Sequence, residues 1–301
     1  MRLFTYTLLS SVFLLAFATS HAQTDPEGLL PNDSAAGKRE YVSATFKGTR
    51  VINGQSVENE AEGVLNFIIL HRFGTLNTGA QNLFGLDNAN TRFGFEYGVK
   101  DWLTLGLGRS SYQKEYDGFA RIKILRQTTD NHMPISLSYA GTVMTRTDDV
   151  QLLDSNDKYY FSNRVSYCNQ ILIARKFSER FSLQLTPSHV HYNIVRDDKD
   201  ANDVFALGIG GRIKLTKRLA LTGEWFATLP GANLEGYHNA LSLGVDIETG
   251  GHVFQLHFSN STGMSERTFI GQTTDTWDDG GIHIGFNVSR VFTIVRPKEF
   301  R

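Results

Sequence analysis

From about residue 64 to its end, the chain repeats one pattern, in which apolar and polar residues alternate along segments of about ten residues. In 91–99, for example, Phe93, Phe95 and Tyr97 fall on one face, and Arg92 and Glu96 fall on the other. Alternation with a period of two predicts strands with one apolar and one polar face. A soluble sandwich alternates as well, so the period alone does not identify a membrane protein.

Three further features favour a membrane barrel. The polar faces carry Gly, Ser and Thr with isolated charges, as in a wet lumen, whereas the apolar faces are almost purely Leu, Ile, Val and Phe. The segments are long enough to cross the hydrocarbon when tilted. Short connections alternate with long polar ones, as in transmembrane barrels. The short ones are 100–101, 177–180, 216–217 and 249–251, and the long ones are 146–158, 196–203, 230–237 and 261–280.

The pattern therefore predicts an all-β fold, a transmembrane antiparallel up-and-down β-barrel of about 12 strands, within the domain 41–301. We expect strands near 64–74, 91–99, 102–111, 117–127, 133–146, 159–176, 181–195, 203–215, 218–229, 239–248, 252–260 and 281–294. Tyr41–Ile52 also alternates, and an even strand count favours placing 41–63 as a periplasmic or lumenal segment before the first barrel strand. Pro187 and the change of apolar phase after it indicate a β-bulge.

The N-terminus has the organisation of a secretory signal peptide. Arg2 precedes an apolar run at 8–18, and small residues flank His21 before Gln23, so we expect residues 1–22 to be cleaved. The alternative is a buried N-terminal helix. Residues 23–40, with two prolines and two glycines, are expected to form a flexible leader. Together with the strand pattern, this start predicts the cell outer membrane and its lipid as the environment of the barrel.

Charge and cysteine content exclude several classes. The net charge is −1, so nothing in the overall charge indicates nucleic-acid binding. The single cysteine, Cys168, excludes an internal disulfide framework. No motif indicates a cofactor, and protein partners are left open.

Several short motifs resemble those of a known family. They include His71-Arg72-Phe73-Gly74, the run 85–90, Gly108-Arg109-Ser110-Ser111, the run 173–178 and the run 248–256. In combination they resemble the β-barrel family labelled domain of unknown function 5777, over about residues 40–295. The resemblance implies an outer-membrane barrel and implies no activity or catalytic residues.

The polar face also carries charged residues of both signs. By alternation these lumen-facing candidates are Arg92, Glu96, Arg121, Lys123, Arg164, Arg212, Lys214, Glu224 and Asp246. A ring of one sign would select ions. Mixed signs can pair and narrow or plug the interior, although twelve strands enclose more space than eight.

Other constellations are weaker. His189 and His191 share one strand face, and His257, Ser259 and His283 lie at inward positions of the last two strands, but nothing marks a complete metal site or a nucleophile. Acidic runs at 148–149, 197–203 and 275–279 match no calcium-loop spacing and are expected to be hydrated loops. We therefore expect no metal and no enzyme. The leading hypothesis is a narrow channel or transporter for a small solute, and the alternatives are a plugged scaffold for surface loops and a lipid hydrolase.

Overall fold

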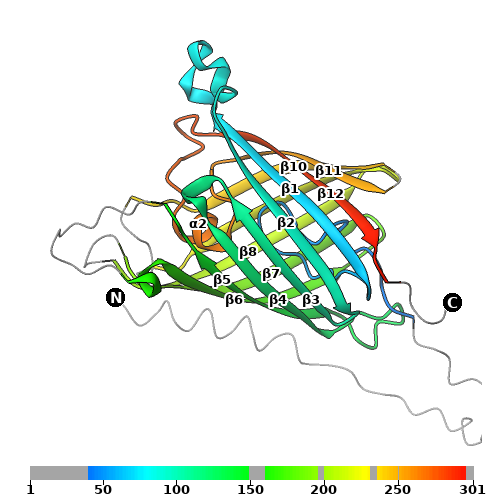
Figure 1. Ribbon diagram of the computed structural model, residues 1–301. Coiled ribbons are helices and arrows are strands. Elements are labelled where there is room, and N and C mark those ends of the chain that lie inside the picture. Colours follow the sequence, from blue (N-terminus) through cyan, green and yellow to red (C-terminus); the bar gives the residue numbers. More distant parts are fainter. Residues whose placement is uncertain (1–39, 149–159, 196–199, 231–235, 250, 296–301) are drawn as a thin grey trace, which may run out of the picture. The chain divides into compact units, whose positions relative to one another are not determined.

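The computed structural model describes residues 40–148, 160–195, 200–230, 236–249 and 251–295. The predicted signal peptide, 1–22, and the predicted leader up to residue 39 lie outside the described residues. The described chain forms twelve strands that close into one antiparallel barrel (Figure 1), which confirms the predicted fold. The strands are β1 (Val64–Thr75), β2 (Ala89–Lys100), β3 (Leu103–Ser110), β4 (Tyr116–Leu125), β5 (Ser136–Thr145), β6 (Val165–Lys176), β7 (Phe181–Tyr192), β8 (Asp203–Lys214), β9 (Leu219–Thr228), β10 (Ala240–Thr249), β11 (His252–Ser259) and β12 (His283–Thr293).

Each strand pairs with its neighbours in sequence, and β1 pairs with β12 to close the barrel. The two ends of the barrel differ in their connections. At one end, here called the short-turn end, lie the tight turns β2–β3, β6–β7, β8–β9 and β10–β11, together with the start of β1 and the end of β12. The opposite end, the long-loop end, carries the connection of residues 260–282 between β11 and β12. Among the described residues, no helix is long and apolar enough to cross a membrane.

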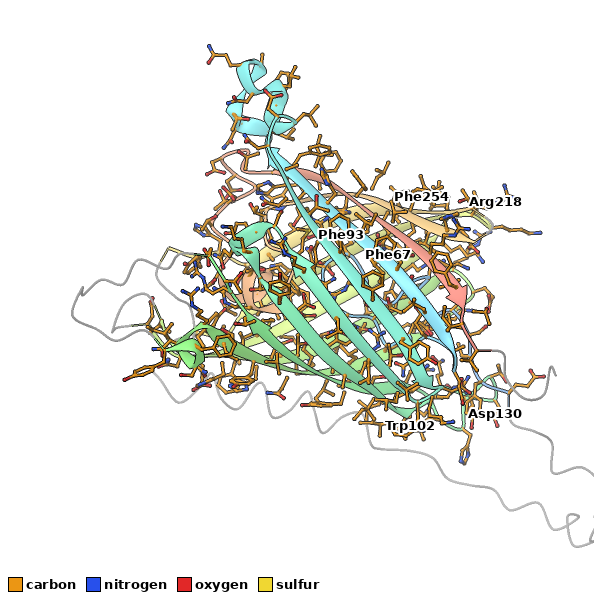
Figure 2. All side chains as sticks on the ribbon, in the orientation of Figure 1. Phe67, Phe93, Trp102, Asp130, Arg218 and Phe254 are labelled. Carbon is orange, nitrogen blue, oxygen red and sulfur yellow. The ribbon has the colours of Figure 1, made fainter. Side chains whose placement is uncertain are left out.

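The two faces of the barrel wall have opposite character. The outer face exposes Leu, Ile, Val, Phe and Trp side chains from nearly every strand, among them Phe93, Phe95, Leu107, Phe205, Leu221, Trp225, Leu243, Phe254 and Leu256. Figure 2 shows Phe67, Phe93 and Phe254 on this outer face, and Trp102, Asp130 and Arg218 at the short-turn end. In a bilayer the apolar outer face would lie against lipid, and the backbone is satisfied by the closed strand ladder.

The bulge predicted at Pro187 is wrong. β7 pairs with β8 without a register shift from Phe181 to His191, and Pro187 lies opposite Leu207. The apolar phase changes because Val190 and Tyr192 point inward and are fully buried. There they join an apolar layer inside the long-loop end, formed with Met144, Cys168, Val204, Ala206, Phe226, Ala240, Phe269 and Ile270.

Two segments that are not strands fill the barrel. Residues 45–57, here called the plug, run inside the ring of strands (blue in Figure 1), and most of their side chains are buried. From the other end, the β11–β12 loop folds inward and carries α2 (Glu266–Gly271), whose residues are all buried. The first half of the polar stretch 261–280 is therefore a lumenal insertion, which corrects the expectation of a hydrated external loop. Short 3-10 turns, η2 (Leu76–Thr78), η3 (Ala80–Gly85), η4 (Tyr112–Lys114) and η5 (Phe161–Arg164), lie in loops at the long-loop end.

Candidate functional site

The plug is a hairpin that enters and leaves at the short-turn end. On its N-terminal side, Val42 N donates to Gln127 O, on the β4–β5 connection. On its C-terminal side, Gly63 N donates to Gly98 O near the β2–β3 turn. The tip is a turn in which Val51 N donates to Gly54 O at 2.9 Å, and Arg50 and Gln55 form the bridge that flanks it. An Asn-Gly pair at 53–54 suits such a tight reversal.

One carboxylate holds this tip. Glu224, on β9, accepts hydrogen bonds from the backbone N–H groups of Ile52 (3.2 Å), Asn53 (2.7 Å) and Gly54 (3.0 Å). The close approach requires glycine at 54, because a Cβ there would lie 2.8 Å from the Phe226 ring. Because both carboxyl oxygens of Glu224 hold consecutive N–H groups of this turn, Glu224 is here called the latch of the plug.

Other wall side chains bind the carbonyl and amide groups along the plug. Gln184, on β7, donates to Gln55 O and accepts from Val57 N, both at 2.8 Å. The remaining contacts are Gln255 Nε2 to Val51 O (2.8 Å), Asn287 Nδ2 to Ile52 O (2.9 Å), Arg121 Nη1 to Thr49 O (3.2 Å) and Ser138 Oγ to Val57 O (3.4 Å). The plug is thus bound through its main chain by residues from β4, β5, β7, β9, β11 and β12.

The plug also makes side-chain contacts to buried wall groups. Arg72, on β1, donates to Asn53 Oδ1 at 2.6 Å and to Asn287 Oδ1 at 3.1 Å. Arg121 donates to Gln55 Oε1 at 2.9 Å. Arg72, Gln184, Gln255 and Asn287 were not among the predicted lumenal site residues. Gln184, Gln255 and Asn287 follow the alternation inward, but uncharged amides gave no reason to single them out. Arg72 was missed because it follows the apolar inward residues Ile68 and Leu70, so polarity does not mark its face of β1.

Four of the nine predicted lumenal charges, Arg92, Glu96, Arg121 and Asp246, bond to other residues of the wall. Arg92 and Asp117 make a buried bidentate pair at 2.8 and 2.5 Å, and Arg121 donates to Glu96 at 3.0 Å. Asp246 accepts from Gln255 and Thr222, and Arg212 donates to Ala44 O at 3.5 Å. The two ion pairs, Arg92–Asp117 and Arg121–Glu96, bring opposite charges of the polar face together.

Three predicted charges lie away from the middle of the lumen. Lys123 and Lys214 are half-buried near the short-turn end. Arg164 is not in a strand. It belongs to η5, before β6 begins, and donates to Asp148 O at the long-loop mouth.

The second insertion meets the plug inside the barrel. Glu266 of α2 accepts hydrogen bonds from Arg50 Nη1 (3.4 Å) and Gln55 Nε2 (3.2 Å), both in the plug. Arg267 donates to Glu115 at 3.1 Å, and Tyr192 donates to the carbonyl of Arg267 at 2.6 Å. With Phe269 and Ile270 packed in the apolar layer, α2 narrows the long-loop end while the plug fills the middle.

A charged pocket remains beside the plug at the short-turn end. It has a volume of about 290 Å³ and is lined by residues 42–45 and 57–61 with Asp101, Lys123, Arg126 and Ser136. Within it, Glu60 accepts a hydrogen bond from Asn66 at 2.7 Å. Burial, with a further contribution from the negative charge of Glu96, raises the pKa of the Glu60 carboxyl to about 7. The folded barrel therefore favours the protonated form of this group at mildly acidic pH.

The raised pKa of Glu60 predicts that the packing of residues 58–63 against the barrel contributes less stability as the pH rises. A carboxyl whose pKa rises from its ordinary 4.5 to about 7 on folding contributes stability below 4.5 that is lost as pH passes 7. Raising the pH from 5 to 8 should lower the free energy of unfolding of the barrel by about 2 kcal/mol. The barrel should then unfold at a lower temperature, which the heat-modifiable gel shift reports. Glu60→Gln should lose this dependence, whereas Glu62→Gln, at an exposed position, should keep it. A dependence unchanged by Glu60→Gln would contradict the assignment.

The weaker candidates from the sequence, histidines and a serine, are divided between the two faces of the wall in the described structure. His189 and His191 are on the outer face and share Asp203 at 2.7 and 2.8 Å, and no group of three ligands suited to a metal occurs among the described residues. Ser259 is bonded to Ser242, and both ring nitrogens of His257 are buried without a hydrogen-bond partner. His283 Nε2 lies 2.9 Å from Thr262 Oγ1 and 3.2 Å from Asp275, and the histidine is buried.

A family model for a membrane-bound β-barrel domain, DUF5777, matches residues 46–292. Among solved structures, the NanC porin has a TM-score of 0.46 and 7% identity, over 77% of this chain and 100% of its own. Omp33 of Acinetobacter baumannii has 0.43 and 8%, over 77% and 99%. Outer-membrane phospholipase A of Escherichia coli has 0.44 and 10%, over 77% and 91%. No curated protein matches this chain.

Proposed function

The chain belongs to the DUF5777 family of membrane-bound β-barrel domains, and we propose that it is an outer-membrane channel for a small polar solute, held closed by its own plug. The observation that carries this proposal is the chemistry of the contact between plug and wall. Behind the plug the wall presents Glu224, Gln184, Gln255, Asn287, Ser138 and Ser242, all of which water can solvate when the plug leaves. A static core would be expected to pack with apolar side chains instead.

The plug is also able to leave without breaking the barrel. Both of its ends lie at the short-turn end, which in membrane barrels faces the periplasm. Every strand of the barrel keeps its two neighbours without residues 40–57, because the ring closes through β1 and β12. The apolar packing that withdrawal would disrupt is small: Phe46, Val51 and Val57 pack on Ala140, Leu172 and Ala174, and Ile52 is buried besides.

Two barriers then act in series. The plug blocks the middle of the lumen, and α2 narrows the long-loop mouth. They are coupled through Glu266, which would lose its bonds to Arg50 and Gln55 when the plug withdraws. In this proposal the protein is not an enzyme. The plugged scaffold is its rival, supported by the depth at which both insertions are buried.

A reversible tether tests the proposal in the full-length chain. A Cβ on Gly210 would lie 3.7 Å from the Cβ of Val51, a separation that suits a disulfide. Val51→Cys with Gly210→Cys, in a Cys168→Ala background, should cross-link the plug to β8. In planar bilayers under applied voltage the reduced protein should open, and the oxidised protein should remain silent.

The matched control is the Gly210→Cys single variant in the same background, which should open whether or not oxidant is present. Equal currents from the tethered and reduced double variant would mean that the current does not pass through the plugged lumen. Silence of both forms at every voltage, with the barrel shown to be folded by its gel shift, would favour the scaffold.

A further inference from the structure

The plug is bound largely as a peptide main chain, and this feature points to the class of solute. Wall side chains engage the carbonyl or amide groups of Thr49, Val51, Ile52, Asn53, Gly54, Gln55 and Val57. Main-chain groups are shared by every peptide, whatever its side chains. The wall therefore carries recognition elements that a peptide of different sequence also satisfies.

The pairing has the pattern that β-strand addition uses. The side-chain amide of Gln184 donates to the carbonyl of Gln55 and accepts from the N–H of Val57, two residues further on. A neighbouring β-strand would bond to the same two groups with its main chain. Glu224 gathers three consecutive N–H groups, which a carboxylate does best at a turn of backbone. A sugar presents hydroxyls around a ring rather than a directional series of N–H and C=O groups, and it is therefore the comparison ligand in the test below.

The wall also accommodates a plug side chain next to these main-chain contacts, because one wall residue there has no side chain of its own. Val51 packs over Gly210, where a Cβ would already lie within 3.2–3.3 Å of its methyl groups. The wall carries both acceptors for peptide N–H groups and donors for peptide carbonyls. Among these wall groups, Glu224 is acidic and Arg121 is basic. These features accommodate a short neutral or zwitterionic peptide.

We propose that the lumen wall binds and passes short peptides through their main-chain groups, and that the plug, whose tip is a turn, occupies this site as an internal mimic of the solute. The proposal rests on the proposed function, since a peptide reaches the wall only when the plug has withdrawn. A peptide that binds the withdrawn state should hold the plug out, because a ligand shifts the population towards the state that it binds.

The test measures plug withdrawal without relying on current. Val51→Cys in the full-length Cys168→Ala protein is buried in the docked plug, so a membrane-impermeant maleimide should label it only after withdrawal. A synthetic peptide of residues 49–57, added at millimolar concentration, should raise the labelling rate at least about tenfold. An unrelated Ala-Ser-Gly nonapeptide should also raise it, with a smaller effect. Ala61→Cys is the control. Ala61 is exposed and lies four residues after the end of the plug, so this cysteine should label at the same rate with or without peptide.

Two further probes decide whether the main chain is recognised. The same peptide with N-methyl groups at the positions of Ile52, Asn53 and Gly54 cannot donate to Glu224 and should have no effect. A maltooligosaccharide of similar mass should also have none. If the N-methylated peptide or the sugar accelerates labelling as much as the parent peptide, or if no peptide accelerates it, peptide recognition is wrong.

The outcomes separate this inference from the channel itself. Labelling that responds to peptides in a protein that never conducts would uphold peptide binding and reject the channel. Currents that depend on the reversible tether, together with labelling that ignores peptides, would uphold the channel and reject peptides as its solute.

Discussion

Glu224→Gln should convert a closed barrel into one that opens often. The amide keeps the shape of the carboxyl group, but its NH₂ group faces backbone donors where an acceptor is needed. A buried N–H group left without its acceptor costs about 1–3 kcal/mol, and each 1.4 kcal/mol is a factor of ten in an equilibrium. We therefore expect the open probability in planar bilayers to rise by about tenfold to a hundredfold.

Asp246→Asn is the matched control. It removes one carboxylate charge from the same lumen wall, but Asp246 accepts from Thr222 and Gln255 on the wall rather than from plug N–H groups. If opening follows from the loss of the latch, Asp246→Asn should open far less often than Glu224→Gln. Similar effects of the two variants would mean that lumenal charge, not the contact with 52–54, sets the closed state.

The barrel was predictable because each strand has one face towards lipid and one towards the lumen, so apolar and polar residues alternate with a period of two. Lipid outside selects Leu, Ile, Val and Phe, and the polar lumen selects the residues between them, so strands such as 91–99 and 203–215 show their two faces directly. Strand boundaries agree closely for the same reason. The expected strand 159–176 begins later, at Val165, because Phe161–Arg164 forms a 3-10 turn that the alternation does not reveal.

The contents of the lumen were much harder to predict. The plug contacts Glu224, Gln255 and Asn287, which are more than 170 residues away in the chain, and an isolated Gln or Asn on a strand resembles any other polar residue. The sequence allowed two placements for 41–63, and one of them was the lumen, where 45–57 lies. The change of apolar phase after Pro187 is real, but its cause is not the predicted bulge. Val190 and Tyr192 are apolar at inward positions because they pack in the layer that contains Phe269 and Ile270 of α2.

Asp117→Leu should be the most destabilising single substitution among the charged residues of the lumen wall. Asp117 is bonded twice to Arg92, both side chains are almost fully buried, and the guanidinium lies over Gly94 and Gly108, where any Cβ would collide with it. Removing the acid leaves a buried arginine without its partner, which costs about 3–5 kcal/mol. The free energy of unfolding, measured by urea titration of the barrel in lipid vesicles, should fall by that amount.

The double variant Arg92→Met with Asp117→Leu distinguishes a structural pair from a functional one. Replacing both members by apolar side chains removes the uncompensated charge, so most of the lost stability should return. Glu62→Gln, which breaks the exposed ion pair with Lys100, should have little measurable effect on unfolding. The hydrogen bonds of the pair join β2 to β4 rather than to the plug, so the double variant should also remain closed in planar bilayers. A double variant that is stable but opens as often as Glu224→Gln would show that the wall pair takes part in holding the plug, and the latch could then not be assigned to Glu224 alone.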